Sequence, residues 1–495
     1  MFDSLVGGFL LFLDVDVLVA MAIAIPIGLV FGILPGLSGI TALAVLLPFV
    51  YGMEPLAGLA FLLSAHAITY TGGSVTAIVL GIPGSPPNAA TVIDGFPLSQ
   101  KGQSGYAIGA ALTSSALGGV VGVAALVVVL PFLQPIVTSF GSPETFLLAL
   151  LGITYLAVLG RGAMVKGLIA GGLGIFLALF GYQRITGVPR FWLESDYLLD
   201  GFRLIPLVIG LFAIPEILAL STGRAIAPDH SAAQLSWRQV WAGVRATIGA
   251  RWLLLRSSLI GVFVGIVPGV GGETATFVAY AAAKQTAANP DQFGNGAIEG
   301  VIAPESANNA KEGGALIPTL ALGIPGSAGM VVLLGGFLLL GLDPGPDFLD
   351  NHMDTAVGLA LVLALANVVA ALLVFALASQ IIKITVVRGT VLAPLLLVLI
   401  VLGTYSAGND PADVLFVFVF GALGYVLKEF DYSRPALLLG FVLGPLLETY
   451  LHISLQAYGP WFFTRPIALA IAALIVLGLA WPLLRGLGGR VGGGP

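Results

Sequence analysis

The chain has 495 residues, of which 58% are hydrophobic and 9% are charged, with a formal net charge of −5 and no cysteine. Water-soluble domains carry about 25% charged residues, so this composition and the mean hydropathy of +1.04 exclude a water-soluble domain and indicate a membrane protein. The missing cysteines exclude disulfides and thiolate metal sites, and the small negative charge argues against nucleic acid as a partner.

Apolar stretches of spanning or near-spanning length recur along the whole chain. They lie at Val17–Leu34, Leu56–Tyr70, Tyr106–Leu130, Thr145–Leu159, Lys166–Phe180, Leu204–Leu220, Leu253–Pro268, Met330–Leu342, Thr355–Ile382, Thr390–Thr404, Val414–Leu427, Pro435–His452 and Pro466–Leu484, with shorter pieces such as Gly39–Val50, Gly72–Gly81, Thr274–Ala283 and Gly313–Gly323 between them. Because one span needs about 20 residues, we expect an all-α polytopic membrane protein of about 11–14 membrane segments, several of them broken. No basic residue precedes the first apolar stretch, so we do not expect a cleaved signal.

One long polar gap, at residues 221–250, divides the chain. From Arg224 to Arg256 the sequence holds five arginines and the single acid Asp229, so the positive-inside rule places this loop in the cytoplasm. The segment 182–203 has balanced charge, which suits the opposite side of the membrane. We therefore expect 1–220 to form a first repeat half, 221–250 a cytoplasmic polar loop, and 251–495 a second repeat half followed by the C-terminal transmembrane helices.

An internal repeat supports this division. The stretch Gly28–Gly39 matches Gly261–Gly272, and Leu80–Ser85 matches Leu322–Ser327, in the same order. Between these motifs, Ser64-Ala-His66 matches Ser306-Ala-Asn308. Two shared motifs in one order indicate a duplicated membrane unit. We favour an inverted relation between the halves, but the parity of the spans between them, and so a parallel relation, stays open.

Gly and Pro within the repeated motifs predict four interruptions, at 34–39, 81–85, 267–272 and 323–327, as broken helices or re-entrant hairpins. Unpaired backbone at membrane depth is tolerated where it is buried in protein or lines a wet cavity, and a half-helix that begins there directs N–H groups at an anion. Close helix packing by small residues is the alternative explanation. We expect substrate contacts from Gly36, Ser38, Gly39, Thr41, Gly84, Ser85, Asn88, Gly271, Gly272, Thr274, Asn308, Asn309, Gly326 and Ser327, and contacts to a coupling ion from Pro35, Ser74, Thr76, Pro268 and Thr276.

Charged residues near these motifs are few: Glu273, Glu305, Lys311 and Glu312. A charged residue in an apolar run is usually functional. For Glu305, Lys311 and Glu312 we nevertheless favour a position at a helix end, where they are hydrated or paired with one another. Asp94 is expected to cap a turn or helix rather than to bind an ion. The four histidines lack the spacing of metal ligands, so no transition-metal site is expected. The sequence has no Walker motif, which argues against ATP hydrolysis. His66, which matches Asn308, is a weaker candidate for the site.

The motifs resemble those of a known family, the large membrane subunit of the tripartite tricarboxylate transporters. The resemblance covers nearly the whole chain and rests on Gly32–Gly39, Tyr70–Gly84, Val92–Pro97, Thr186–Arg190, Pro304–Asn309, Gly313–Pro318, Leu322–Ser327, Gly421–Tyr425 and Leu439–Glu448. It implies a multi-pass protein of the bacterial inner membrane that works with a small membrane subunit of about four spans and a periplasmic substrate-binding protein. The chain departs from the family pattern at Lys311 and Glu312, where small neutral residues are expected.

The resemblance implies import of a small carboxylate, citrate or another di- or tricarboxylate, driven by a sodium or proton gradient. No cofactor is expected beyond that coupling ion, Na⁺ or H⁺. The carrier would work by alternating access around a midplane site, through rocking or elevator motion. A passive channel and an intramembrane enzyme are the alternatives, although the sequence shows neither a metal constellation nor paired acids on facing helices for an enzyme.

Overall fold

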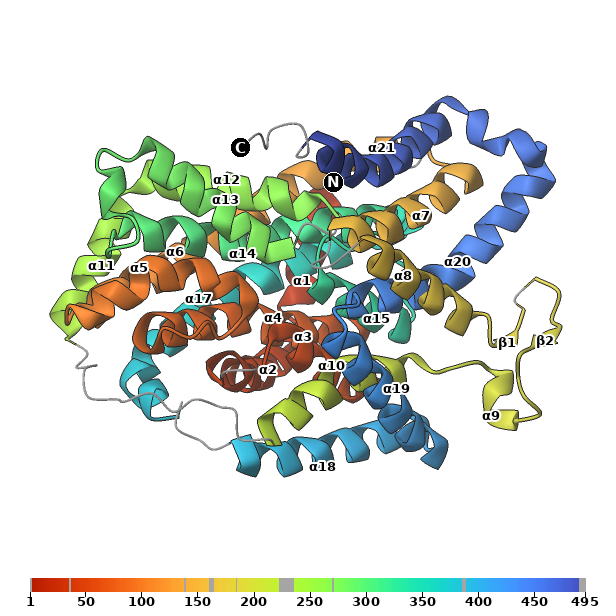
Figure 1. Cartoon of the computed structure of the whole chain (residues 1–495), viewed down its shortest axis with the longest axis horizontal. Coiled ribbons are helices and arrows are strands. Elements are labelled where there is room, and N and C mark those ends of the chain that lie inside the picture. The colour runs from red at the N-terminus through yellow and green to blue at the C-terminus, as the bar shows by residue number, and fades with distance from the viewer. Residues whose placement is uncertain are drawn as a thin grey trace, which may run out of the picture.

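The computed structural model describes residues 2–34, 37–137, 139–159, 164–183, 185–221, 236–268, 271–384 and 389–488. Within these ranges the chain is almost wholly helical (Figure 1), with one small antiparallel sheet of β1 (Gly181–Tyr182) and β2 (Pro189–Arg190). The all-α fold class predicted from the apolar stretches is therefore confirmed. Up to the polar gap the helices are α1 (Phe2–Phe12), α2 (Val15–Ile33), α3 (Gly39–Leu46), η1 (Leu47–Val50), α4 (Pro55–Leu80), η2 (Pro86–Asn88), α5 (Ala89–Gln100), α6 (Ser104–Val137), α7 (Ser142–Leu159), α8 (Met164–Ala178), α9 (Asp196–Leu199) and α10 (Leu204–Ser221).

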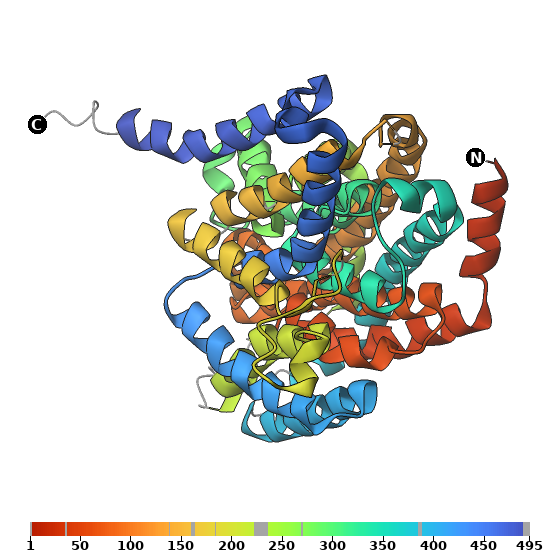
Figure 2. The ribbon, with the colours of Figure 1, turned by 90° about the vertical axis from the view of Figure 1, so that its right-hand side faces the viewer.

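The remaining helices continue to the C-terminal region, and Figure 2 shows α1 and α21 at opposite edges of the bundle. They are α11 (Trp237–Gly249), α12 (Arg251–Ile266), α13 (Gly271–Thr286), η3 (Pro290–Gln292), α14 (Glu299–Leu322), α15 (Ala328–Leu339), α16 (Pro346–Asn351), α17 (Met353–Ile384), α18 (Gly389–Gly408), α19 (Pro411–Glu429), α20 (Arg434–Tyr458), η4 (Gly459–Thr464) and α21 (Pro466–Gly488).

The described residues contain seven helices that are long and apolar enough to cross a membrane, or eight if the bent pair α11 and α12, which meet at 75°, forms one span. Seven further apolar helices are shorter, at 10–17 residues. The long spans alone are thus fewer than the 11–14 expected segments, because the interruptions and turns divide much of the apolar sequence into short helices. The chain is a multi-pass membrane protein by these criteria.

The four predicted interruptions coincide with helix boundaries. Helix α2 ends before the first and α3 begins after it, while α12 and α13 flank the third in the same way. Helices α4 and α14 end at the second and fourth. The pieces Gly72–Gly81 and Gly313–Gly323, which are too short to span alone, form the C-terminal turns of α4 and α14, because a glycine pair inside a packed helix does not by itself break it.

Helices α4 and α14 form the centre of the bundle. Helix α4 is buried from Leu56 to Ile78, and α14 is buried from Gly300 to Ala321. Helix α4 packs on α2 and α17, and α14 packs on α6, α12 and α13. Since α6 belongs to the first half of the sequence and α14 to the second, the two halves interlock. The two halves are therefore not separate domains, and their relation as repeats stays a prediction from the sequence.

The predicted polar loop at 221–250 contains a helix. Residues 222–235 lie outside the described ranges, but α11 follows them with Trp237 and Trp241 exposed on its surface. Helix α11 packs against α6. The loop therefore ends in an amphipathic helix that turns sharply into α12, a form that suits a position along the membrane surface.

Candidate functional site

The second and fourth interruptions have the same backbone form. Helix α4 ends at Gly81 with φ +66°, and α14 ends at Gly323 with φ +66°, a left-handed conformation that favours glycine. The chain then becomes extended at Ser85 and at Ser327. Ser327 Oγ accepts a hydrogen bond from the backbone N–H of Met330 at 3.3 Å and so caps α15.

Gly84 and Gly326 bring each extended segment against the helices of its own half. A Cβ on Gly84 would lie 2.8 Å from Thr76 Oγ1 and still closer to the backbone of Gly32 and Gly73. A Cβ on Gly326 would lie 2.7 Å from Ala315 Cα, beside the carbonyl of Gly265. Gly32 and Gly265 are matching positions of the repeat. Both interruptions thus need glycine for the same close approach.

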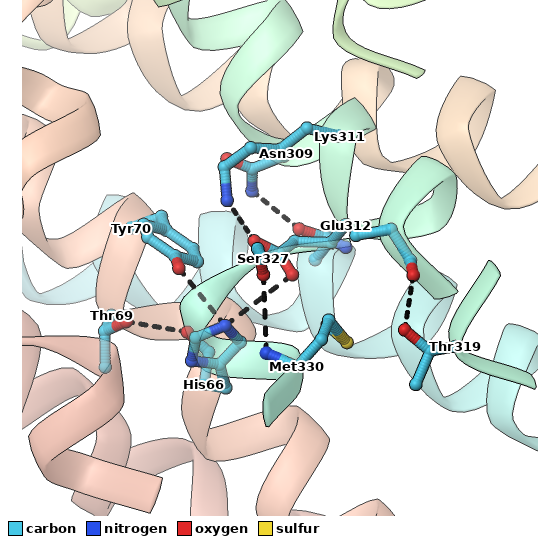
Figure 3. Close-up of polar contacts among 11 residues, drawn as sticks. His66, Thr69, Tyr70, Asn309, Lys311, Glu312, Thr319, Ser327 and Met330 are labelled. Carbon is cyan, nitrogen blue, oxygen red and sulfur yellow. Dashed lines mark hydrogen bonds and ion pairs between the residues drawn. The ribbon is translucent and has the colours of Figure 1, made fainter. Parts of the chain in front are cut away.

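A group of four side chains, which we call the central cluster, lies between α4 and α14. It consists of His66 and Tyr70 on α4 and of Lys311 and Glu312 on α14, and the four are drawn in Figure 3. Tyr70 Oη lies 3.1 Å from His66 Nε2, which in turn lies 3.6 Å from Glu312 Oε2. Lys311 Nζ pairs with Glu312 Oε1 and lies 4.1 Å from the centre of the Tyr70 ring. All four side chains are buried.

Broken helices from both halves converge on this cluster. A Cβ on Gly39, the first residue of α3, would lie 2.7 Å from His66 Nδ1, and a Cβ on Gly329 in α15 would contact the same ring. Gly272, in the first turn of α13, faces the aliphatic stem of Lys311. The amino-terminal turns of three broken helices therefore surround the two basic residues, and such turns attract anions.

Glu305 forms a second buried polar centre, nearly two turns before Lys311 on α14. Its carboxylate accepts hydrogen bonds from Thr91 Oγ1 at 2.5 Å, Ser74 Oγ at 2.7 Å and Ser115 Oγ at 2.8 Å. Asn88 Nδ2 lies 3.5 Å from it. The carboxylate thus joins α14 to α4, α5, α6 and η2, and its hydrogen bonds offset the loss of water around a buried charge.

The expectation that Glu305, Lys311 and Glu312 lie at a helix end is wrong. All three occupy the interior of α14 and are at most 2% exposed. Lys311 and Glu312 do pair with each other, as one version of that expectation held, but Glu305 is bonded to hydroxyl groups instead. The sequence misled because α14 is polar for a spanning helix, and only its complete enclosure by other helices makes those charges tolerable.

Several predicted substrate residues present polar atoms without a hydrogen-bond partner among the described residues. They include both amide atoms of Asn308, Oδ1 of Asn309 and of Asn88, and Oγ of Ser85. His66 Nδ1 and Glu312 Oε2 share this property. Buried polar groups normally have partners, so each of these atoms retains the capacity for a further hydrogen bond.

Other predicted residues already serve the scaffold. Ser38 Oγ caps α3 by accepting from the backbone N–H of Thr41 at 3.3 Å. Asn309 Nδ2 donates to Asn367 Oδ1 at 2.6 Å. Thr76 Oγ1 donates to the carbonyl of Gly73. These hydrogen bonds do not test whether Ser38, Asn309 and Thr76 also contact a ligand.

The remaining predicted residues are spread along the third interruption and its neighbours. Thr276 is buried on α13, whereas Thr274 is exposed, and Pro268 follows the end of α12. Gly271 is the first residue of α13. Pro35, Gly36 and the side chain of Glu273 lie outside the described part of the chain. Within the described part, no three His, Asp or Glu residues are grouped to hold a metal ion.

Sequence reasoning missed Tyr70, Thr91 and Ser115 as members of the polar centres. Tyr70 follows His66 by one helical turn, so their spacing was a usable signal. Thr91 and Ser115 carried none, because their relation to Glu305 depends on how α5 and α6 pack against α14. Asp94, expected to cap, accepts backbone N–H groups of Gly294, Gly296 and Ala297 at 2.7–2.9 Å and so holds the turn before α14.

A separate contact joins two of the motifs that carried the family resemblance. Arg190 in β2 binds Glu448 in α20 through two hydrogen bonds of 2.7 and 2.9 Å. Both side chains line a cavity of about 330 Å³, together with Asp200 and Phe441. The pair fixes the 181–203 segment, which projects from the bundle in Figure 1, to the middle of the spanning helix α20.

Comparison with known proteins decides the family. A model of the Tripartite tricarboxylate transporter TctA family matches residues 18–439. The chain belongs to the TctA family. It is 32% identical over 461 residues to an uncharacterized 52.8 kDa protein in the TAR-I ttuC′ 3′ region of Agrobacterium vitis, covering 92% of this chain and 91% of that protein.

A second relative of the TctA-family chain is an uncharacterized protein in the TAR-II ttuC′ 3′ region of Agrobacterium vitis. It is 38% identical over 227 residues, which are 45% of this chain and 93% of that protein. No solved structure matches the chain. Because the family is one of transporters, the chain is a transporter subunit and not an enzyme, and it belongs to a tripartite system.

Proposed function

We propose that this TctA-family subunit imports small carboxylates, citrate or other di- and tricarboxylates, across the bacterial inner membrane. A sodium or proton gradient would drive the import. A periplasmic binding protein would supply the substrate, and a small membrane subunit of about four spans would complete the complex. The observation that carries the proposal is the convergence of three amino-terminal helix turns on buried His66 and Lys311, together with buried amide and hydroxyl groups that have no hydrogen-bond partner among the described residues. Such a set of donors suits an anion.

The site lies where the two halves meet, which supports alternating access. Helix α3 of the first half packs on α15 of the second, and α13 of the second half packs on α5 and η2 of the first. This reciprocal exchange is what a two-fold relation between the halves would produce, and it supports a duplicated unit, whether the repeat is inverted or parallel. One group of helices moving against the other would open the site to each side in turn.

Uptake of a labelled carboxylate panel, with citrate, malate and succinate, tests the proposal in cells that contain all three components. Imposed sodium and proton gradients are compared. We expect concentrative uptake that collapses with one of the gradients. A passive channel would give uptake that only equilibrates the substrate, and the absence of uptake for every member of the panel under both gradients would contradict the carboxylate assignment.

Glycine variants connect the activity to the site. Gly84→Leu and Gly326→Leu should abolish uptake, because each new side chain would enter backbone packed within van der Waals contact. Gly172→Leu is the matched control, since no atom lies within 4 Å of a Cβ at that position on α8. Equal loss of uptake in all three variants, at equal protein levels in the membrane, would show that the effect is not specific to the interruptions.

A further inference from the structure

The central cluster holds two basic side chains around one carboxylate. Glu312 Oε1 pairs with Lys311 Nζ, while Glu312 Oε2 faces His66 Nε2 at 3.6 Å. At the matching positions of the first half, Lys311 and Glu312 correspond to Thr69 and Tyr70, which are neutral. The lysine and the carboxylate of the cluster thus come from the second half only, and the net charge of the cluster depends on whether the imidazole of His66, from the first half, is protonated.

We propose that the central cluster is a proton-operated anchor for one carboxylate group of the substrate, an inference that rests on the proposed function. With His66 neutral, Lys311 and Glu312 neutralise each other and Lys311 is not free to bind an anion. With His66 protonated, the imidazolium takes over Glu312, and Lys311 turns to the substrate carboxylate. One proton is bound with each substrate molecule and is released with it on the other side of the membrane.

The charges balance in each state. The empty cluster with neutral His66 has one ammonium and one carboxylate and is neutral. The proton enters at His66 Nδ1, which has no partner among the described residues and lies beside the first turn of α3. The cluster then carries one positive charge, and one substrate carboxylate restores neutrality. A buried site strongly favours such neutral combinations, because an uncompensated charge there is expensive.

The neighbours of Lys311 fit the role of an anchor. Its stem faces Gly272 in the first turn of α13, so the ammonium stands near a helix terminus that favours anions. Asn308 lies one turn earlier on the same face of α14, and both of its amide atoms are unpaired among the described residues. An amide and an ammonium on one helix face together supply hydrogen bonds and charge to a carboxylate.

No other described charge competes for His66. Helices α3 and α15, which face its ring, contain no titratable side chain. Helix α6 carries Tyr106 but no charged residue. The titratable groups on the other helices packed against α4 are Asp16 at the start of α2, Asp94 on α5, Asp354 and Lys383 near the ends of α17, and Glu299 and Glu305 on α14, besides Tyr70, Lys311 and Glu312 in the cluster itself.

Binding of ¹⁴C-labelled citrate, malate and succinate to the purified complex, from about pH 6 to pH 8 without sodium, tests the anchor. For the wild type we expect the affinity to fall with rising pH by up to about tenfold per pH unit, because one proton is linked to binding. His66→Asn, which places the matching residue of the second half at this position, should bind weakly at every pH. A slope caused by titration of the substrate itself would persist in His66→Asn.

Glu312→Gln should have the opposite effect. Without the carboxylate, Lys311 is free at every pH, so binding should be as tight at pH 8 as wild-type binding at pH 6. Lys311→Met should weaken binding about 30-fold or more at all pH values, as expected when one partner of a buried charge pair is removed. A merely structural cluster would make all three variants bind less well, with the wild-type slope retained in any that bind.

The controls are His452→Asn and Lys166→Met. They repeat the histidine and lysine substitutions at partly exposed residues outside the central cluster. Both should keep the wild-type slope. A wild-type slope in His66→Asn, or weaker binding in Glu312→Gln, would overturn the anchor while concentrative uptake by the wild type kept the carrier assignment intact. If the wild-type complex neither bound nor transported any of the three probes, the proposed function would fall together with the anchor.

Discussion

Replacing Ser115 by alanine tests whether Glu305 holds the centre of the bundle together. Ser115 is fully buried on α6 and donates a 2.8 Å hydrogen bond to Glu305 Oε2. Its neighbour Ser114 is equally buried on the same helix, but its hydroxyl lies 3.5 Å from Thr247 Oγ1. The two serines thus differ chiefly in whether their partner is a carboxyl group at short distance or a hydroxyl at the limit of bonding.

The expected magnitudes follow from those geometries. A hydrogen bond to a charged group contributes about 1.5–3 kcal/mol, whereas hydrogen bonds between neutral groups of membrane helices average about 0.6 kcal/mol. Ser115→Ala should therefore lower the free energy of unfolding by about 1.5–3 kcal/mol, and Ser114→Ala by less than about 1 kcal/mol. In a Glu305→Gln background the Ser115→Ala effect should shrink, because the charge that strengthened the bond is gone.

Reversible unfolding of the purified subunit in mixed detergent micelles, followed by tryptophan fluorescence, measures the difference. The wild type, the three single variants and the Ser115→Ala/Glu305→Gln double variant all need the same unfolding cooperativity for the comparison. If Ser115→Ala lost no more stability than Ser114→Ala, or if its effect were unchanged by Glu305→Gln, Glu305 would not be the hub that its contacts describe.

Three further predictions concern the scaffold. Asp94→Ala should speed hydrogen exchange of the 294–297 turn, because three backbone amides lose a shared acceptor worth about 2–4 kcal/mol in all; unchanged exchange would contradict the capping role. Arg190→Met should raise proteolysis of the 181–203 segment while lowering overall stability by about 1 kcal/mol or less, since its ion pair with Glu448 is a quarter exposed. Gly81→Ala should lower thermal stability by roughly 1–2 kcal/mol, because φ +66° is strained for alanine, and an unchanged midpoint would refute that reading.

The interruptions were predictable because Gly and Pro act locally. The motif around Gly81 predicted a helix end, and the structure ends α4 there with a left-handed glycine. The duplicated motif around Gly323 gave the same result on α14. The close approach at Gly84 agrees with the alternative explanation that small residues pack backbones closely, whereas the predicted contact of Gly84 with substrate stays a prediction.

The polar centres were not predictable to the same degree. Lys311 and Glu312 looked like residues of a wet helix end because the sequence around them is poor in large apolar residues. Only the packing of α6, α12 and α13 around α14 turns that stretch into a buried core. The partners of Glu305 come from α4, α5, α6 and η2, and the sequence distance between them and Glu305 holds no information about contact.

The enclosure of α14 has a consequence for how the protein is made. This helix carries Glu299, Glu305, Lys311 and Glu312, and each charge near the middle of a helix opposes insertion into lipid by about 2.5–3.5 kcal/mol. Helix α14 is therefore a poor candidate to enter the bilayer by itself. Its entry requires α6 and α12 to be present beforehand as a protein surface, so that biogenesis of the subunit follows an order in which the outer helices receive the central one.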